Sequence, residues 1–104
     1  MQRIAFKMRL KPGVIEEYKR RHDQIWPELA ALLKESGIGD YSIFFDEETN
    51  SLFAVQKQAG ASSSQDLGTT TIVRRWWDYM ADIMDTNPDH SPVSIPLTEV
   101  FHLD

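Results

Sequence analysis

The first segment of the chain alternates apolar and polar residues, which is the period of a β-strand. In RIAFKMRLK the basic residues occupy one side of the strand, and Pro12 and Gly13 then interrupt the pattern. The apolar side consists of Ile4, Phe6, Met8 and Leu10. The pattern therefore predicts a strand over residues 3–10 with its apolar side against the core.

After Gly13 the apolar positions recur every three or four residues, which is the period of an amphipathic helix. They are Ile15, Tyr18, His22, Ile25, Leu29 and Leu32. Pro27 has no N–H for the carbonyl of Asp23 and its ring clashes with that carbonyl, so we expect the helix to break. A second helical piece should start at Pro27, where proline suits the first helical position, and stop at Gly37.

Two aromatic and β-branched segments, YSIFFD and SLFAVQKQ, predict a pair of strands over residues 41–46 and 51–58. The four residues between them, EETN, suit a short hairpin loop. Residues 59–70 are small and polar. They form either a linker or a short helix capped by Ser62, with Gln65 three positions later.

A second helical period covers residues 71–84. Its apolar members are Val73, Trp76, Trp77, Met80, Ile83 and Met84. Because adjacent side chains on a helix diverge by about 100°, one of the two indoles should lie at the rim of the core, where its N–H reaches a polar group. The proline-rich residues 86–96 predict a loop, and LTEVFHL, residues 97–103, predicts a final strand.

The predicted order is strand, helix, strand, strand, helix, strand within one domain that covers residues 1–104. This βαββαβ order is typical of ferredoxin-like α+β folds, in which an antiparallel sheet carries its helices on one face. The other face of such a sheet needs cover. Pairing two sheets in a homodimer of the dimeric α/β barrel type is the simplest way to provide that cover for so small a core.

Composition narrows the possible partners. The chain has 11 Lys plus Arg against 16 Asp plus Glu and a net charge of −5, without a basic block, so we expect no nucleic acid partner. The alternating N-terminal segment resembles neither a signal peptide nor a membrane span, so we expect no membrane partner. The absence of cysteine removes disulfides and thiolate chemistry and predicts a cytoplasmic protein.

Several common kinds of site are not predicted. Gly37 and Gly39 lead into a strand, so the glycines form no loop for a phosphate or a dinucleotide. His22, His90 and His102 are scattered, and no two have the spacing that brings imidazoles together on one metal. The serine-rich segment lacks the Gly-x-Ser-x-Gly turn of an exposed nucleophile. We therefore expect a site with no cofactor and no metal.

The remaining candidates are amphipathic rings, whose density is high for so short a chain. They are Tyr18, His22, Trp26, Tyr41, Trp76 and Trp77. Such residues form protein cores, and they also form sugar-binding sites. Core packing is the more common role of a tryptophan or a lone histidine, and for Tyr41 the two roles fit equally well. Tyr18 lies one turn before His22 on the same side, so two proton-bearing groups converge near the break at Pro27.

The segments EEYKRRHDQIWPEL, YSIF, RRWWDYM and TNPDHSPVS closely resemble the L-rhamnose mutarotase family, whose members interconvert the α and β anomers of L-rhamnose. The resemblance runs nearly end to end, with the motifs in the family's order and spacing. It implies a homodimer with a ferredoxin-like fold. It also implies that His22 is the catalytic proton donor and that Tyr18, Tyr41, Trp76 and Trp77 contact the sugar.

Mutarotation requires only two proton transfers, and positioned acid–base catalysis supplies about 10²–10⁴-fold acceleration. His22 would donate to the ring oxygen, while Tyr18, Tyr41, a backbone carbonyl or a water would take the anomeric proton. Two other classes of function are alternatives: a dimeric ferredoxin-like monooxygenase for a flat aromatic substrate, and a non-catalytic sugar-binding module. Neither alternative predicts the histidine motif and the paired tryptophans together.

Overall fold

The computed structural model describes residues 2–60 and 63–104 of the chain. Within these residues, the strands and helices follow the predicted order. Their bounds are β1 Gln2–Arg9, α1 Ile15–Asp23, α2 Pro27–Glu35, β2 Ile38–Asp46, β3 Ser51–Gln58, the 3₁₀ helix η1 Ser64–Asp66, α3 Thr71–Met80 and β4 Ile95–Leu97. In the described ranges, no helix combines the length and the apolar character that a bilayer crossing requires.

The strands form one antiparallel sheet in the order β2-β3-β1-β4. β1 lies between β3 and β4, with Phe6 opposite both Ala54 and Pro96. β2 and β3 form the predicted hairpin, and their register shifts between Gly39 and Ser42. The prediction of a ferredoxin-like α+β fold is therefore confirmed.

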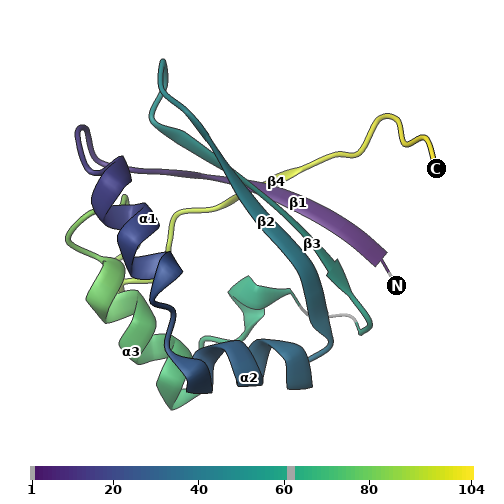
Figure 1. Cartoon of the computed structure of the whole chain (residues 1–104), viewed down its shortest axis with the longest axis horizontal. Coiled ribbons are helices and arrows are strands. Elements are labelled where there is room, and N and C mark those ends of the chain that lie inside the picture. Colours follow the sequence, from purple (N-terminus) through teal and green to yellow (C-terminus); the bar gives the residue numbers. More distant parts are fainter. Residues whose placement is uncertain (1, 61–62) are drawn as a thin grey trace.

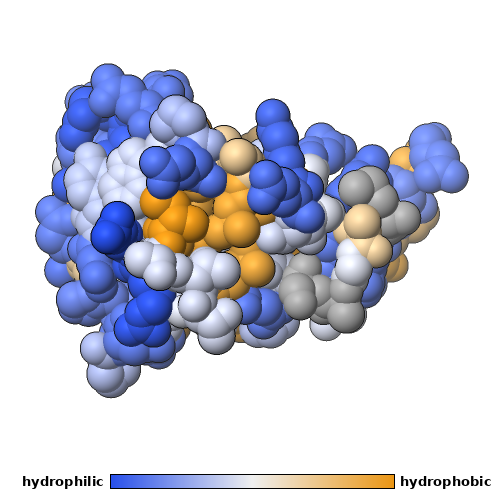
Figure 2. All heavy atoms as spheres, turned by 90° about the horizontal axis from the view of Figure 1, so that it is seen from below, coloured by the Kyte–Doolittle hydropathy of each residue, from blue (hydrophilic) through white to orange (hydrophobic). Residues whose placement is uncertain are grey.

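All three α-helices lie on one side of the sheet (Figure 1). Alternate residues of the central strands point toward them and are buried, namely Phe6, Met8, Leu52 and Ala54. Figure 2 views the side of the molecule on which α2 lies in Figure 1, and it shows an apolar area bordered by hydrophilic side chains. The opposite face of the sheet carries no helix from the described part of the chain.

The predicted break before Pro27 is confirmed. α1 ends at Asp23, α2 begins at Pro27, and the two helices run in clearly different directions (Figure 1). Trp26 has φ and ψ angles of −61° and 128°, the extended conformation that the residue before a proline favours. The carbonyl of Trp26 accepts hydrogen bonds from the N–H groups of Leu29 and Ala30 and so starts the new helix.

The segment between β3 and α3 contains a short helix, but its cap is not the predicted one. The side chain of Ser63 accepts a hydrogen bond from the N–H of Gln65 at 3.1 Å, and Asp66 accepts one from the N–H of Ser63 at 2.8 Å. Ser62, the predicted cap, lies outside the described residues. Of the neighbouring serines, Ser63 has a carboxylate three positions later, and an ionised acceptor binds an N–H more strongly than an amide does.

A buried polar pair fixes η1 against the sheet. Gln56 is fully buried on β3. Its Nε2 donates to the hydroxyl of Ser64 at 2.9 Å, and its Oε1 accepts from the N–H of Ser64 at 2.9 Å. Because both ends of the amide are bound, the pair satisfies its buried polar groups and holds Ser64 on the helix side of the sheet.

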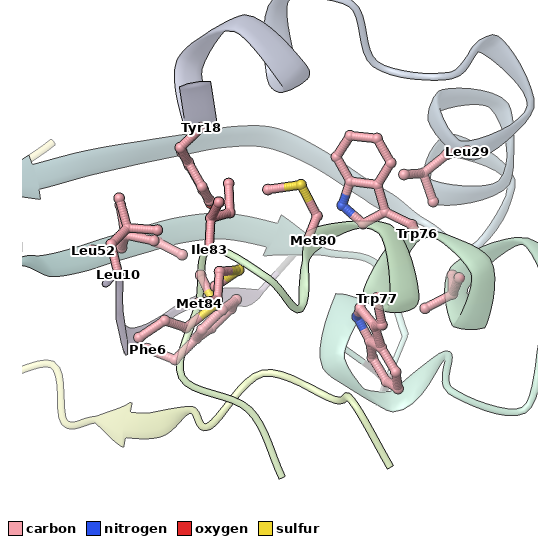
Figure 3. Packing of buried hydrophobic residues seen from close by; sticks show 13 residues of the cluster. Phe6, Leu10, Tyr18, Leu29, Leu52, Trp76, Trp77, Met80, Ile83 and Met84 are labelled. Carbon is pink, nitrogen blue, oxygen red and sulfur yellow. The ribbon is translucent and has the colours of Figure 1, made fainter. Parts of the chain in front are cut away.

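The prediction that one of the paired tryptophans lies at the rim is wrong, because Trp76 and Trp77 are 8% and 7% exposed. The two indoles do diverge, and Figure 3 shows Trp76 directed toward Leu29 and Trp77 directed away from it. Different segments cover them. Trp26 packs edge-on against Trp76, whereas the loop at Gly68 lies against Trp77.

The last helix and strand are shorter than predicted. α3 ends at Met80, and Ile83 and Met84 are buried in the turns that follow it. β4 covers only Ile95–Leu97, and residues 98–104 have no regular secondary structure. Side-chain contacts replace the strand ladder there, since Arg3 lies 3.7 Å from Glu99 and bonds to His102 at 2.6 Å.

Candidate active site

A cavity of about 720 Å³ opens between the three α-helices and the helix-covered face of the sheet. The structure brings together on its lining all five predicted site residues, Tyr18, His22, Tyr41, Trp76 and Trp77. Charged side chains from Lys19, Asp23, Lys34 and Asp40 also contribute to the lining. The volume falls in the range of about 300–1,000 Å³ that is usual for small-molecule sites.

His22 reaches this cavity from the last turn of α1. Its Nδ1 lies 3.1 Å from the carbonyl oxygen of Tyr18. A carbonyl only accepts hydrogen bonds, so Nδ1 carries the proton and donates it. Among the residues that the structure describes, no group bonds to Nε2. A role for His22 in core packing therefore accounts for one ring nitrogen, and the other ring nitrogen remains available to a ligand.

Burial sets the protonation of the titratable rings in the cavity. It lowers the pKa of His22, although the hydrogen bond with the Tyr18 carbonyl and the charge of Asp23 oppose this effect. Burial also raises the pKa of Tyr18, with a smaller contribution from Tyr41. It raises the pKa of Tyr41 as well, and a hydrogen bond with Ser64 opposes that change. At neutral pH the cavity therefore presents a neutral imidazole and two neutral phenols.

Aromatic contacts fix the walls on both sides of the imidazole. The ring centroids of Tyr18 and His22 lie 4.3 Å apart on α1. Trp76 meets His22 edge-on at 5.4 Å, and Trp26 meets Trp76 edge-on at 5.1 Å. Edge-to-face pairs of this kind are favourable. Trp26, the sixth ring of the predicted set, does not line the cavity and instead supports the indole that does.

Gly68 gives Trp77 the space for its position. A Cβ atom at residue 68 would lie 2.7 Å from Cζ3 and 2.8 Å from Cη2 of the Trp77 indole. Such distances are too short for carbon atoms, and a six-membered aromatic ring does not yield as a flexible chain end does. The missing side chain therefore lets the loop lie against one wall of the cavity. Sequence analysis did not identify this glycine, because the contact depends on how the loop returns to α3.

Other lining residues were missed for a similar reason. The sheet contributes Met8, Ile43, Phe45 and Leu52, the segment around η1 contributes Ser64 and Gln65, and the loop before β4 contributes Pro92. The period-two alternation of the strands indicated that their apolar residues face the helices. It gave no sign that the space between the layers is hollow, because that depends on how α1 and α2 diverge.

The other histidines lie elsewhere. His90 bonds to Asp78 at 2.8 Å, and His102 bonds to Arg3 in the C-terminal segment. Neither residue lines the cavity. Within residues 2–60 and 63–104, no three histidine or acidic side chains gather closely enough to hold a metal ion together.

The arrangement suits a small ligand that has both hydroxyl groups and C–H faces. Indoles and aliphatic side chains cover C–H faces, while phenolic hydroxyls donate hydrogen bonds to oxygen atoms. The imidazole of His22, which can take up and release a proton near neutral pH, also lines the cavity. The site can therefore bind a polar ring and move a proton on it.

Comparisons with known proteins agree with this description. The sequence model of a family described as L-rhamnose mutarotase matches residues 3–103. An L-rhamnose mutarotase of Bacteroides thetaiotaomicron is 66% identical over 104 residues, and one of Formosa agariphila is 62% identical over the same length, with both chains covered completely. A crystal structure of L-rhamnose mutarotase from Formosa agariphila superposes with a TM-score of 0.93 at 59% identity, covering all of both chains.

These matches span the whole fold, including the segments that carry the cavity residues. They give no support to the monooxygenase or to the non-catalytic sugar-binding module. The chain belongs to the L-rhamnose mutarotase family.

Proposed function

We propose that this chain interconverts the α and β anomers of L-rhamnose in the cavity beside His22. The observation that carries the proposal is one imidazole that lines a cavity of small-molecule size, with Nδ1 bound to its own helix and Nε2 bound to none of the described residues. Membership of the L-rhamnose mutarotase family supports both the reaction and the sugar.

His22 acts in this proposal as a proton shuttle through Nε2. The neutral imidazole takes the proton of the anomeric hydroxyl O1 while the bond between C1 and the ring oxygen O5 breaks. The resulting imidazolium donates that proton to O5, which leaves a neutral open-chain aldehyde and a neutral imidazole. O1 and O5 are both attached to C1, so one nitrogen serves both atoms. Rotation of the aldehyde and the reverse sequence give the other anomer.

The two phenols bind the sugar and do not act as bases. Burial raises the pKa of both Tyr18 and Tyr41, which keeps their hydroxyl groups protonated at neutral pH. A protonated phenol donates a hydrogen bond to a sugar hydroxyl or to the developing charge on an oxygen. The sequence left Tyr18, Tyr41, a backbone carbonyl or a water as the base, and we propose that His22 takes this role in addition to that of the donor.

The sheet face without helices supports a homodimer. Its rows of opposed residues include the apolar side chains Ala5, Phe44, Phe53, Val55, Ile95 and Leu97. Phe44 is 62% exposed and Ile95 is 51% exposed. A second copy that packs the same face against this one would cover them by a self-complementary contact. The absence of cysteine supports a reducing compartment, and we place the enzyme in the cytoplasm.

Replacing His22 by glutamine removes the proton shuttle and leaves a neutral polar side chain of similar size in the cavity. We expect the enzymatic exchange of L-rhamnose anomers to fall by about 10²–10⁴-fold. Saturation transfer between the anomeric proton signals measures this rate by NMR, and calorimetry with L-rhamnose reports whether the cavity still binds. A folded, sugar-binding His22→Gln variant that exchanges anomers at the parent rate would remove His22 from the mechanism.

The pH dependence follows from the lowered pKa of His22. The shuttle starts from the neutral imidazole, which predominates above the pKa of His22. We therefore expect kcat/KM to rise with pH to a plateau, with the midpoint of the rise below the usual histidine pKa of about 6.5. The measurement is the same NMR exchange rate, corrected for the uncatalysed reaction at each pH. A rate that falls as pH rises through this range would assign the initial step to the imidazolium and contradict the shuttle.

Substituting Gly68 by alanine should displace the Trp77 indole, because the new Cβ would lie 2.7 Å from its ring. We expect a rise in KM for L-rhamnose together with a loss of stability of about 1–3 kcal/mol from overpacking. Gly60→Ala is the matched control, since no described residue has an atom within 4 Å of a Cβ at that position. Equal KM values and equal melting temperatures for the two variants would show that Gly68 has no effect on the wall.

The homodimer is tested by size-exclusion chromatography with light scattering. The parent should have twice the chain mass of 12.0 kDa. Ile95→Glu, which places charges on the apolar sheet face, should shift the protein toward monomer, whereas Ala31→Glu on the exposed side of α2 should not. A parent protein with the mass of one chain at micromolar concentration would refute the dimer.

A further inference from the structure

Arg21 makes an unusually complete set of contacts for a residue outside the cavity. Its side chain is only 10% exposed. Nε donates to Glu17 at 2.6 Å on the same helix, and Nη1 donates to the carbonyl of Tyr79 at 2.8 Å. Nη1 and Nη2 bind both carboxylate oxygens of Asp82, at 2.9 and 3.2 Å. The forked guanidinium therefore joins α1 to the end of α3 in a bidentate geometry that lysine does not reproduce.

The same arginine also reaches the aromatic cluster behind the cavity. Its guanidinium carbon lies 4.5 Å from the ring centroid of Tyr79, a cation–π contact. Tyr79 stacks on Trp26 at 5.6 Å and lies 5.7 Å from Trp76. Trp76 in turn meets the imidazole of His22, which directly follows Arg21 in the chain. These contacts form a closed path from α1 through α3 and back to α1.

This path of contacts determines where α1 lies against α3, which the hydrogen bond of His22 does not. The bond between Nδ1 and the Tyr18 carbonyl lies within α1, so it orients the imidazole on its own helix. It does not determine where that helix lies against α3 and its two indoles. α1 is short, begins after Gly13 and ends before the break at Pro27, so its position depends on side-chain contacts. Arg21 makes polar contacts of this kind with Tyr79 at the end of α3 and with Asp82 just beyond it.

We propose that Arg21 is a positioning residue for the anomer exchange, which sets the distance between the imidazole of His22 and the indole wall on α3. This inference rests on the proposed function. Arg21 acts through the placement of α1 and touches no reacting atom. A shift of about 1 Å in a reacting group is enough to cost about 100-fold in rate. The contacts by which Arg21 holds α1 against α3 therefore affect the rate through the position of His22.

The ion pairs of Arg21 with Glu17 and Asp82 keep their charges while His22 gains or loses a proton. Hydrogen bonds from Arg20 and Arg21 lower the pKa of Glu17 to about 2, and the hydrogen bond from Arg21 lowers the pKa of Asp82. Both carboxylates therefore stay ionised over the working range of pH. The ion pairs hold α1 in the same place whether His22 is neutral or carries the proton of the sugar.

The test compares Arg21→Gln, Arg21→Lys and Asp82→Asn with the parent. We expect kcat for L-rhamnose exchange to fall by about 10- to 100-fold in Arg21→Gln, and less in Arg21→Lys and Asp82→Asn, with a smaller change in KM. Arg75→Gln is the matched control, because Arg75 is an exposed arginine that directly precedes Trp76 on α3 as Arg21 precedes His22 on α1. Its kcat should equal that of the parent.

A second measurement separates positioning from a purely structural role. The pKa of His22 is followed by ¹⁵N NMR of the imidazole, and it should rise toward the ordinary value in Arg21→Gln as water enters beside a loosened α1. A lower melting temperature with unchanged kcat and an unchanged His22 pKa, both measured well below unfolding, would overturn the inference. If the parent does not accelerate anomer exchange, the proposed function fails, whereas an unchanged His22 pKa in Arg21→Gln contradicts the positioning role independently of activity.

Discussion

The cavity depends on the constraint that Pro27 places on the backbone. A proline at this position does not continue the hydrogen-bond ladder of α1, and it holds Trp26 in an extended conformation. α1 and α2 consequently leave the break in different directions (Figure 1), and residues of both helices line the cavity between them and the sheet. The break also directs Trp26 toward Trp76. Pro27 thus separates the two helices, and the residue before it, Trp26, supports a wall of the site.

The chemistry of the site follows from placing few polar groups in apolar surroundings. Burial disfavours the charged form of each ring, which gives a neutral imidazole and neutral phenols even though the charge of Asp23 favours the imidazolium. Arg21, which joins α1 to the end of α3, does not line the cavity and is neutralised by Glu17 and Asp82. Its ion pairs are therefore separate from the titratable rings of the site.

Local patterns accounted for the features that depend on neighbouring residues in the chain. The alternation of β1, the hairpin of β2 and β3 and the break at Pro27 were predictable because strand pleat and proline geometry act over a few residues. The proximity of Tyr18 and His22 was predictable for the same reason, since residues four apart share one face of a helix. The combination of motifs then indicated the family.

Features that depend on tertiary contacts were not predictable. The burial of both Trp76 and Trp77 requires two separate covering segments, and the one at Gly68 is fixed by the buried bonds between Gln56 and Ser64. Serine-rich composition does not show which serine caps η1. Nor does the apolar character of residues 97–103 show where pairing with β1 stops.

The floor of the cavity includes three methionines, Met8, Met80 and Met84, all of them buried. Methionine is unbranched and has several rotatable bonds, so its thioether adapts to neighbours of different shape. An enzyme that runs an equilibrium in both directions must accommodate an axial and an equatorial hydroxyl, and the extended aldehyde between them, at comparable cost. Flexible thioether side chains suit this requirement, because they can adapt to each form of the sugar while the helices remain where they are.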